Sequence, residues 1–335
     1  MAKKRKSNNR RIIIKDDKHG LPYSKGLMAS SIMATGLPPS QSYQVAKKIE
    51  DQLLSGRKNS VTIQELRRVT LDVIRNSVGN KYAEKFQQWQ ALSKLDKPLI
   101  MLIGGTTGVG KSTIASETAH RLGITRIIST DGIREVMRAI FSQELMPALY
   151  NSSFNAGKGL RIPMIKTADP IIMGFREQAS VVAVGVRAII ERAIKEGTNQ
   201  IVEGVHIVPG FVDLSTFSED AFIISFVVSV EDENLHRSHF YIRELETEGF
   251  RPFERYRANF DNIRKIGEYI EVLAKDQHIP VISSHNLDST VSEILEDVLS
   301  RVVGPKGRES ADASPVGAGS NSDQSGTNVV EETPI

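Results

Sequence analysis

Short apolar runs alternate with longer amphipathic stretches along residues 98–303. The runs are apolar at nearly every position, which is typical of parallel strands covered on both faces of a sheet. The stretches between them repeat apolar residues every three or four positions, which predicts helices. The runs that we predict to be strands lie at 99–103, 124–129, 200–202, 221–230 and 280–283. Strands alternating with helices indicate an α/β fold, here a three-layer core with a right-handed parallel sheet.

The region before this pattern, residues 12–97, shows mainly the helical period. Residues 12–14 predict one short strand, and residues 20–22 predict a turn. Apolar spacing and a capping pattern predict helices at 25–35, 40–54, 62–77 and 81–92. We therefore expect a small, mainly helical domain at 12–97 and an α/β domain at 98–303.

The two ends of the chain differ in composition from these domains. Six cations fall within residues 1–11, and residues 304–335 are rich in glycine, serine, asparagine and glutamate without an aromatic residue. We predict that both ends are disordered tails. A basic tail also suits nucleic acid, but only 6% of the residues are aromatic and none lies among the tail's cations. A stacking platform is therefore missing, and we expect no nucleic-acid partner.

The overall composition narrows the class of protein further. With 335 residues, 40% of them apolar, the chain is long enough for two folded units. The absence of cysteine excludes disulfides and thiolate metal sites. No apolar run approaches the roughly 18 residues that cross a bilayer, and the first residues lack the apolar segment of a signal peptide. We expect a cytoplasmic protein with no membrane partner, and a homo-oligomer stays open.

Residues 99–113 join a predicted buried strand, a glycine-rich turn and the start of a helix. Gly105, Gly108 and Gly110 lack a Cβ atom, so the backbone can turn its N–H groups toward an anion. Lys111 supplies a charge for the outer phosphates of a nucleotide, and the hydroxyl of Ser112 suits the accompanying Mg²⁺. This spacing is the P-loop pattern, and it predicts ATP and Mg²⁺ as cofactors. The residues expected to bind the nucleotide are Gly105, Thr106, Thr107, Gly108, Val109, Gly110, Lys111, Ser112 and Thr113.

Two carboxylates follow predicted strands at the edge of the sheet where the P-loop also lies. Asp131 comes directly after the second strand and before a helix predicted at 133–141. It suits a general base or a Mg²⁺ ligand, and the alternative is a helix N-cap. Glu203 ends the third strand, where the acid of a P-loop site holds the Mg²⁺ shell. We expect Lys111 and Asp131 to be catalytic and Ser112 with Glu203 to hold the metal, whereas the adjacent His206 is typical of a structural histidine.

Arginines are the second group of candidate residues. Arg134 and Arg138 lie four positions apart and therefore share one face of their helix. A planar guanidinium makes bidentate contacts with phosphate and carboxylate. We expect both arginines to bind the substrate if it carries these two groups, as the family resemblance given below implies.

Two further segments are predicted to cover the site. Residues 150–170 are polar and contain glycine, which predicts a mobile loop next to the substrate. Residues 231–257 are dense in arginine and histidine, which fits the lid of a kinase. Lid arginines screen the charge of a transferred phosphoryl group, so we expect Arg243 to be catalytic and Arg237 to bind substrate. For any one of these residues, an ordinary pair on the helix surface, such as Arg243 with Glu246, is the alternative.

The N-terminal pattern resembles a known nucleotide-binding domain. The matching residues are Lys15, Asp16, Ser24, Lys25, Gly36, Leu37, Thr62, Glu65 and Leu66, together with the helix ending at 54. In this order they resemble the ATP-cone, a regulatory domain, although this chain has Lys15-Asp16-Asp17 where that family usually has a basic residue followed by Arg-Asp-Gly. The resemblance implies nucleotide binding by residues 12–97, and a helical docking domain stays the alternative.

Three segments of the second unit resemble the archaeal-type 2-phosphoglycerate kinases. The segments are 104–112, 129–138 and 203–210, and the likeness extends over residues 12–303. In this family an ATP-cone-like region precedes a P-loop kinase domain, so the resemblance implies a three-layer P-loop kinase core after a small helical domain. It also implies transfer of the γ-phosphoryl group of ATP to the 3-hydroxyl of 2-phosphoglycerate, which gives 2,3-bisphosphoglycerate.

Two other functions would keep the same P-loop residues. A kinase for another metabolite or for a polynucleotide end needs the same phosphate cradle. A non-catalytic, nucleotide-dependent regulator would bind ATP and turn over slowly with every small acceptor. Release of ADP, measured with a panel of phosphorylated hydroxyacids, separates these functions.

Overall fold

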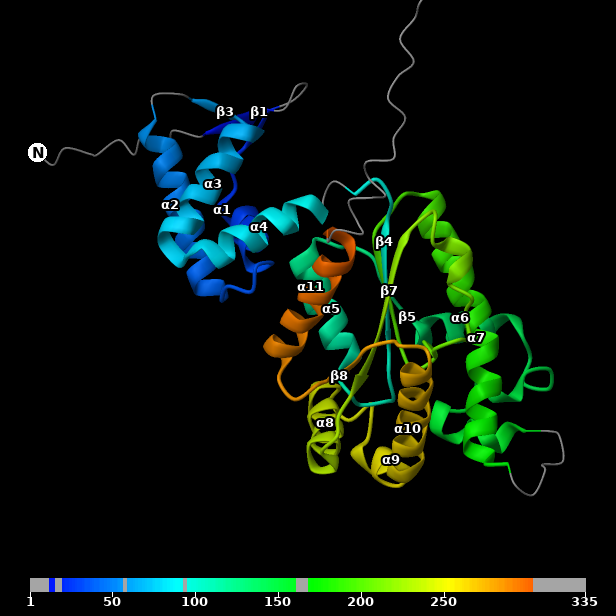
Figure 1. The fold of residues 1–335 in the computed structure, drawn as a ribbon. Helices are drawn as coiled ribbons and strands as arrows, with labels where there is room; N and C mark the ends of the chain where they lie inside the picture. The colour runs from blue at the N-terminus through cyan, green and yellow to red at the C-terminus, as the bar shows by residue number, and fades with distance from the viewer. Residues whose placement is uncertain (1–11, 16–19, 57–58, 93–94, 161–167, 304–335) are drawn as a thin grey trace, which may run out of the picture.

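The computed structural model describes residues 12–15, 20–56, 59–92, 95–160 and 168–303 (Figure 1). The two predicted tails lie outside the described residues. Within the described ranges, no helix combines the length and the apolar character that crossing a membrane requires.

The first unit contains four helices and a small sheet. The helices are α1 (Lys25–Met33), α2 (Pro39–Ser55), α3 (Ile63–Val78) and α4 (Asn80–Leu92), close to their predicted positions. The strands are β1 (Ile13–Lys15), β2 (Gly20–Pro22) and β3 (Ser60–Thr62), in the order β2-β1-β3. The prediction of a turn at 20–22 was wrong, because a strand of three residues is too short to show alternation. The resemblance to the ATP-cone stays a prediction.

The second unit is built on a five-stranded sheet, as predicted. Its strands are β4 (Leu99–Gly104), β5 (Ile127–Ser129), β6 (Gln200–Glu203), β7 (Phe222–Ser229) and β8 (Val281–Ser283). Their order is β5-β6-β4-β7-β8, and every pair is parallel. The all-apolar β4 is therefore central, and every one of its residues is buried. Because parallel strands share one direction, the carboxyl ends of β4, β5 and β6 meet at the same edge.

Helices cover both faces of this sheet, which confirms the three-layer α/β core. Met101 and Ile103 of β4 pack on one face against α5 (Lys111–Leu122) and α11 (Leu287–Val303). Ile100 and Leu102, which alternate with them, pack on the other face against α7 (Pro170–Lys195). The remaining helices are α6 (Thr130–Ile140), α8 (Glu233–Glu246), α9 (Phe253–Arg257) and α10 (Phe260–Asp276).

The mobile loop predicted at 150–170 is wrong for its first half. The 3₁₀ helix η1 (Pro147–Tyr150) ends at the first residue of this part, and a second one, η2 (Ser153–Gly159), lies within it with Phe154 buried. Glycine here serves close packing: a Cβ atom on Gly174 of α7 would lie 2.1 Å from the amide nitrogen of Gly157. Residues 161–167 of the same prediction lie outside the described residues.

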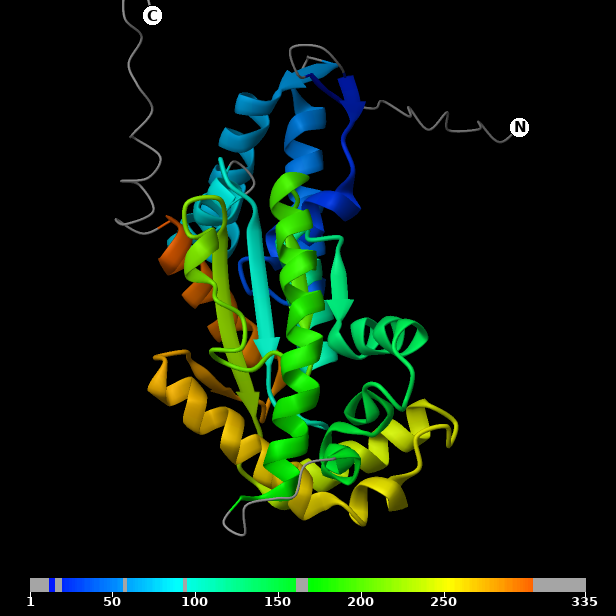
Figure 2. The same cartoon turned by 90° about the vertical axis from the view of Figure 1, so that its right-hand side faces the viewer.

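The two units contact each other through α4. Lys85 of α4 forms an ion pair of 2.6 Å with Glu296 of α11, and the indole of Trp89 donates a 3.1 Å hydrogen bond to the carbonyl of Arg121 at the end of α5. The first unit lies toward the amino-terminal ends of the long strands, and their carboxyl ends point away from it (Figure 2). The carboxyl edge of the sheet is thus left to the candidate site.

Candidate active site

The turn between β4 and α5 has the backbone of a phosphate cradle. Gly105, Gly108 and Gly110 have φ angles of 132°, 88° and 86°, in the region that other residues rarely adopt. Gly108 is also tightly enclosed, because a Cβ atom there would lie 2.4 Å from the ring of Phe240. The turn leads directly into α5, whose positive N-terminal end favours an anion.

Lys111 lies inside this cradle. Its side chain is buried, and its Nζ donates a 2.6 Å hydrogen bond to the carbonyl of Thr106. Burial lowers the pKa of Lys111, whereas the carboxylates of Glu203 and Asp131 oppose that shift. A lysine held this way supplies a proton donor and a charge to anything bound in the turn.

Ser112 and Glu203 meet as the sequence predicted. The Oγ of Ser112 donates to Oε1 of Glu203 over 3.0 Å, although the residues are 91 positions apart. A hydroxyl and a carboxylate are oxygen donors of the kind that Mg²⁺ prefers, and Mg²⁺ fills its other positions with water and substrate phosphates. Among the described residues, no cluster of three or more histidine, aspartate or glutamate side chains forms a fuller metal site. The donor set therefore fits Mg²⁺ shared with a nucleotide.

A cavity of about 590 Å³ opens on these groups. The predicted residues Lys111, Ser112, Asp131, Glu203 and Arg243 all line it. Thr107, Gly108, Gly110 and Thr113 of the nucleotide prediction line it as well, whereas Gly105, Thr106 and Val109 line a smaller cavity of about 130 Å³ behind the turn. Arg134, Arg138 and Arg237 are not among the residues that line the larger cavity.

Asp131 is not a helix N-cap, so that alternative was wrong. Helix α6 starts at Thr130, earlier than predicted, and its N-cap is Ser129, whose Oγ accepts a 3.1 Å hydrogen bond from the amide of Gly132. Asp131 lies in the first turn with its side chain 62% exposed toward the cavity side of α6. The carboxylate is therefore free of capping and open to a ligand in the cavity.

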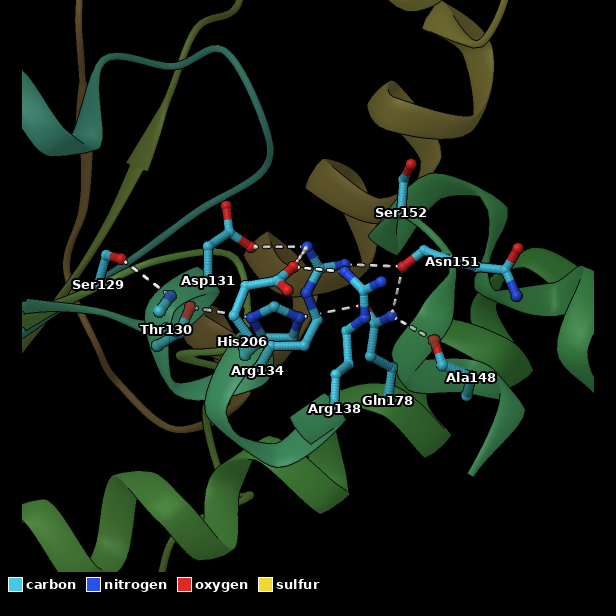
Figure 3. Close-up of polar contacts among 12 residues, drawn as sticks. Ser129, Thr130, Asp131, Arg134, Arg138, Ala148, Asn151, Ser152, Gln178 and His206 are labelled. Atoms are coloured by element: carbon cyan, nitrogen blue, oxygen red, sulfur yellow. Dashed lines mark hydrogen bonds and ion pairs between the residues drawn. The ribbon is translucent and has the colours of Figure 1, made fainter. Parts of the chain in front are cut away.

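Arg134 and Arg138 are already engaged by the protein (Figure 3). Nη1 of Arg134 donates to the carbonyl of Asn151 over 2.7 Å, and its Nη2 lies 3.7 Å from Oδ1 of Asp131. Arg138 pairs with Glu135 at 2.6 Å and lies over the ring of Tyr150. Each keeps a buried Nε atom without a hydrogen-bond partner. These Nε atoms are inaccessible to solvent, so an anion bound by either arginine has to share the Nη groups with their protein partners.

Helix α8 borders the cavity and touches the turn. Nε2 of His236 and Nδ1 of His239 approach the carbonyls of Thr107 and Gly108 at 2.8 and 2.9 Å. Sequence reasoning missed these contacts, although two histidines three positions apart on a helix signal a common face. Arg243 lines the cavity, whereas Arg237 lies 3.6 Å over the ring of Phe260.

The loop after β8 was also missed. Ser284, His285, Asn286 and Leu287 line the cavity opposite α6. Its sequence carries no motif, and only the strand order places it beside the turn.

His206, expected to be structural, is buried with both ring nitrogens paired. Nδ1 lies 2.9 Å from Oγ1 of Thr130, and Nε2 lies 3.0 Å from Oε1 of Gln178 (Figure 3). Burial lowers the pKa of His206 to about 3, with smaller contributions from the charges of Arg134 and Lys111. The imidazole is therefore neutral at physiological pH.

Comparisons with known proteins agree with this site. No family model matches the chain. The 2-phosphoglycerate kinase of Methanopyrus kandleri is 39% identical over 302 residues, which cover 89% of this chain and 90% of that protein. The 2-phosphoglycerate kinase of Methanothermobacter thermautotrophicus is 40% identical over 87% of this chain and 95% of its own length, and that of Pyrococcus furiosus is 40% identical over 88% and 94%.

Similar solved structures share much less sequence. A gluconokinase from Sinorhizobium meliloti is 16% identical with a TM-score of 0.36, covering 63% of this chain and 97% of its own. A shikimate kinase from Acinetobacter baumannii is 14% identical with a TM-score of 0.37, covering 65% and 98%. The family is shown by the relatives that are about 40% identical to this chain over nearly its whole length. The chain belongs to the 2-phosphoglycerate kinases.

Proposed function

We propose that this protein transfers the γ-phosphoryl group of ATP to the 3-hydroxyl of 2-phosphoglycerate. The observation that carries the proposal is the convergence of Lys111, Ser112, Glu203 and Asp131 on one cavity, from three separate strand ends. The relatives named 2-phosphoglycerate kinase support the identity of the acceptor. The products are 2,3-bisphosphoglycerate and ADP.

The nucleotide end would hold the triphosphate of ATP. The backbone amides of the turn and the ammonium group of Lys111 would bind the β- and γ-phosphates, as in other P-loop enzymes. Ser112 and Glu203 would hold a Mg²⁺ ion, which neutralises phosphate charge when bound. Arg243 lines the same cavity and would screen the charge that develops during transfer.

The acceptor end would lie along α6. Asp131 would orient the 3-hydroxyl and accept its proton while the new O–P bond forms and the bond from the γ-phosphorus to ADP breaks. Arg134 and Arg138 lie on the same helix as Asp131, and their guanidinium groups would bind the phosphate and carboxylate of 2-phosphoglycerate. Arg237 would approach the same substrate only after leaving the ring of Phe260.

The proposal places the enzyme in the cytoplasm, where ATP and phosphoglycerates are found. Its substrate is a small molecule, and no further partner is required for the reaction.

A coupled assay of ADP release tests the proposed function. The panel contains 2-phosphoglycerate, 3-phosphoglycerate, glycerate and an oligonucleotide with a free 5′-hydroxyl, each with ATP and Mg²⁺. We expect turnover with 2-phosphoglycerate and at least about 10²-fold less with 3-phosphoglycerate, since its hydroxyl lies on the adjacent carbon and is misplaced by more than an ångström. Comparable rates with both isomers, or preference for the oligonucleotide, contradict the acceptor. ATP binding without turnover on any acceptor favours a regulator.

A further inference from the structure

A buried hydrogen-bond network joins the acceptor side of the site to the strand that carries Glu203 (Figure 3). Its centre is His206, which follows β6, with Thr130 at one ring nitrogen and Gln178 of α7 at the other. Thr130, Gln178 and His206 are all nearly inaccessible to solvent, at 0%, 0% and 2% exposure. Polar groups this deeply buried are costly unless every one is paired, so their arrangement is closely specified.

We propose that His206 is a positioning residue, which sets Asp131 and Arg134 in place relative to Glu203 through Thr130 and Gln178. The inference rests on the proposed function, because it assigns Asp131 and Arg134 to the acceptor. His206 itself does not contact the reacting atoms, because both of its ring nitrogens are hydrogen-bonded to protein groups.

The proton positions of the network follow from its partners. The amide nitrogen of Gln178 donates to the carbonyls of Ala148 and Asn151, at 2.5 and 2.9 Å. Oε1 of Gln178 is therefore left to accept, and the proton between it and His206 must be on Nε2. Nδ1 of His206 then accepts from the hydroxyl of Thr130. One neutral tautomer satisfies every atom, and a protonated ring would leave the Thr130 hydroxyl without an acceptor in His206.

Both ends of the network reach acceptor groups. Thr130 is the first residue of α6, so fixing its side chain fixes the helix turn that carries Asp131. The carbonyl of Asn151, which Gln178 holds, also accepts the 2.7 Å hydrogen bond from Nη1 of Arg134. His206 therefore ties the strand of Glu203 to both the carboxylate and the guanidinium of the acceptor end.

A second feature holds Thr130 at the same place. Gly204 has a φ angle of 149°, and a Cβ atom there would lie 1.8 Å from Oγ1 of Thr130. Only glycine lets the threonine approach the end of β6 this closely. An apolar side chain at position 130 would pack against Gly204 as well. The hydrogen bond from Thr130 to His206 therefore fixes the orientation of the side chain in addition to its packing.

Matched threonine variants test the inference. Thr130→Val removes the hydroxyl at nearly constant volume, and Thr130→Ser keeps it. The control is Thr118→Val on α5, because the buried Oγ1 of Thr118 has no hydrogen-bond partner among the described residues. Gln178→Leu breaks the other end of the network. The KM for 2-phosphoglycerate, the KM for ATP, kcat and the melting temperature are measured for each.

We expect Thr130→Val and Gln178→Leu to raise the KM for 2-phosphoglycerate about 10-fold, because the groups that bind the acceptor are then no longer held in place. The KM for ATP should change less than about twofold, and Thr130→Ser and Thr118→Val should stay within twofold of wild type. Nitrogen NMR of histidine-labelled protein should show His206 as the Nε2–H tautomer from pH 5 to pH 8.

Equal changes of both KM values, or no change in either, overturn the inference, as does the Nδ1–H tautomer. If Gln178→Leu does not fold, the Thr130→Val and Thr130→Ser pair decides alone. Absence of wild-type turnover with 2-phosphoglycerate contradicts the proposed function instead, and the two failures are distinct.

Discussion

The two ends of the site are built in different ways. The nucleotide end comes from one stretch of 15 residues, in which β4, the glycine turn and the start of α5 follow directly on one another. The acceptor end brings together residues of α6, the segment after η1, α7 and the loop after β6, which are spread over residues 130–206. Backbone amides dominate the first end, whereas side chains held by backbone carbonyls and by other side chains dominate the second.

This difference has a consequence for binding. The turn can receive phosphate with little rearrangement, because only the contact of Lys111 with the Thr106 carbonyl has to be exchanged. Arg134 and Arg138 keep internal partners, and a bound anion has to share them with Asn151 and Glu135. We infer that the acceptor end is the part of the site that depends most on the surrounding fold.

Removing the ammonium of Lys111 should produce the largest effect and break the nucleotide end. Lys111→Ala is expected to lower kcat on the order of 10³-fold, since a positioned charge on the transferred phosphoryl is lost. The melting temperature should stay near wild type, because the variant also removes a buried charge. Lys275→Ala, at an exposed lysine of α10, is the control. Wild-type turnover by Lys111→Ala contradicts the kinase mechanism.

Asp131→Asn tests the acceptor end of the site. We expect kcat to fall about 10²-fold while both KM values stay within about threefold, since the amide keeps the size but accepts no proton. The helix start should survive, because Ser129 caps α6. Asp261→Asn is matched, being an exposed aspartate in the first turn of α10. A KM effect without a kcat effect makes Asp131 a binding residue.

The sequence was sufficient for the glycine turn of the nucleotide end, because its signals are local, although it did not show the contacts of His236 and His239 with that turn. Eight consecutive residues contain the glycines that need positive φ, Lys111 and Ser112. The sequence motif alone therefore predicts the geometry of the turn. The prediction that Glu203 lies beside Ser112 was also correct, because parallel strands end at the same edge of the sheet. The all-apolar runs predicted the sheet because a strand that is buried on both faces has no polar position.

The acceptor end was predictable only as a set of residues. Arg134 and Asp131 were named correctly as neighbours, but nothing in the chain indicates that Asn151 holds the arginine or that Gln178 meets His206. These contacts depend on the close approach of Gly204 to the Thr130 side chain and of Gly174 to the backbone of Gly157, which exist only in the fold. The N-cap interpretation of Asp131 failed because Ser129, two residues earlier, was equally suited to that role.

Truncating Arg134 should have a smaller effect, confined to the acceptor. Arg134→Ala is expected to raise the KM for 2-phosphoglycerate about 10- to 100-fold, the loss of a charged hydrogen bond, with the KM for ATP unchanged. Arg134→Lys should recover part of this, because a point charge cannot replace a planar fork. Arg192→Ala, at an exposed arginine of α7, is the control. If only the KM for ATP rises, Arg134 belongs to the nucleotide end.

The smallest expected effect concerns His236, the long-range component of the nucleotide end. Burial lowers its pKa to about 4, and the carbonyl of Thr107 opposes the shift only in part. The unfolded chain, with a pKa near 6.5, therefore takes up the proton first, so this contribution to stability is complete above about pH 6.5 and is lost as the pH falls toward 4.

Melting temperatures at pH 7 and pH 5 measure this loss. Wild type should lose more between the two than His236→Gln, whose amide donates to the same carbonyl without titrating, by on the order of 3 °C. His120→Gln, at an exposed histidine of α5, should respond to acid as wild type does. If all three proteins lose the same melting temperature between pH 7 and pH 5, the contact of α8 with the turn adds nothing to stability. The stability of the nucleotide end would then depend only on its own stretch of sequence.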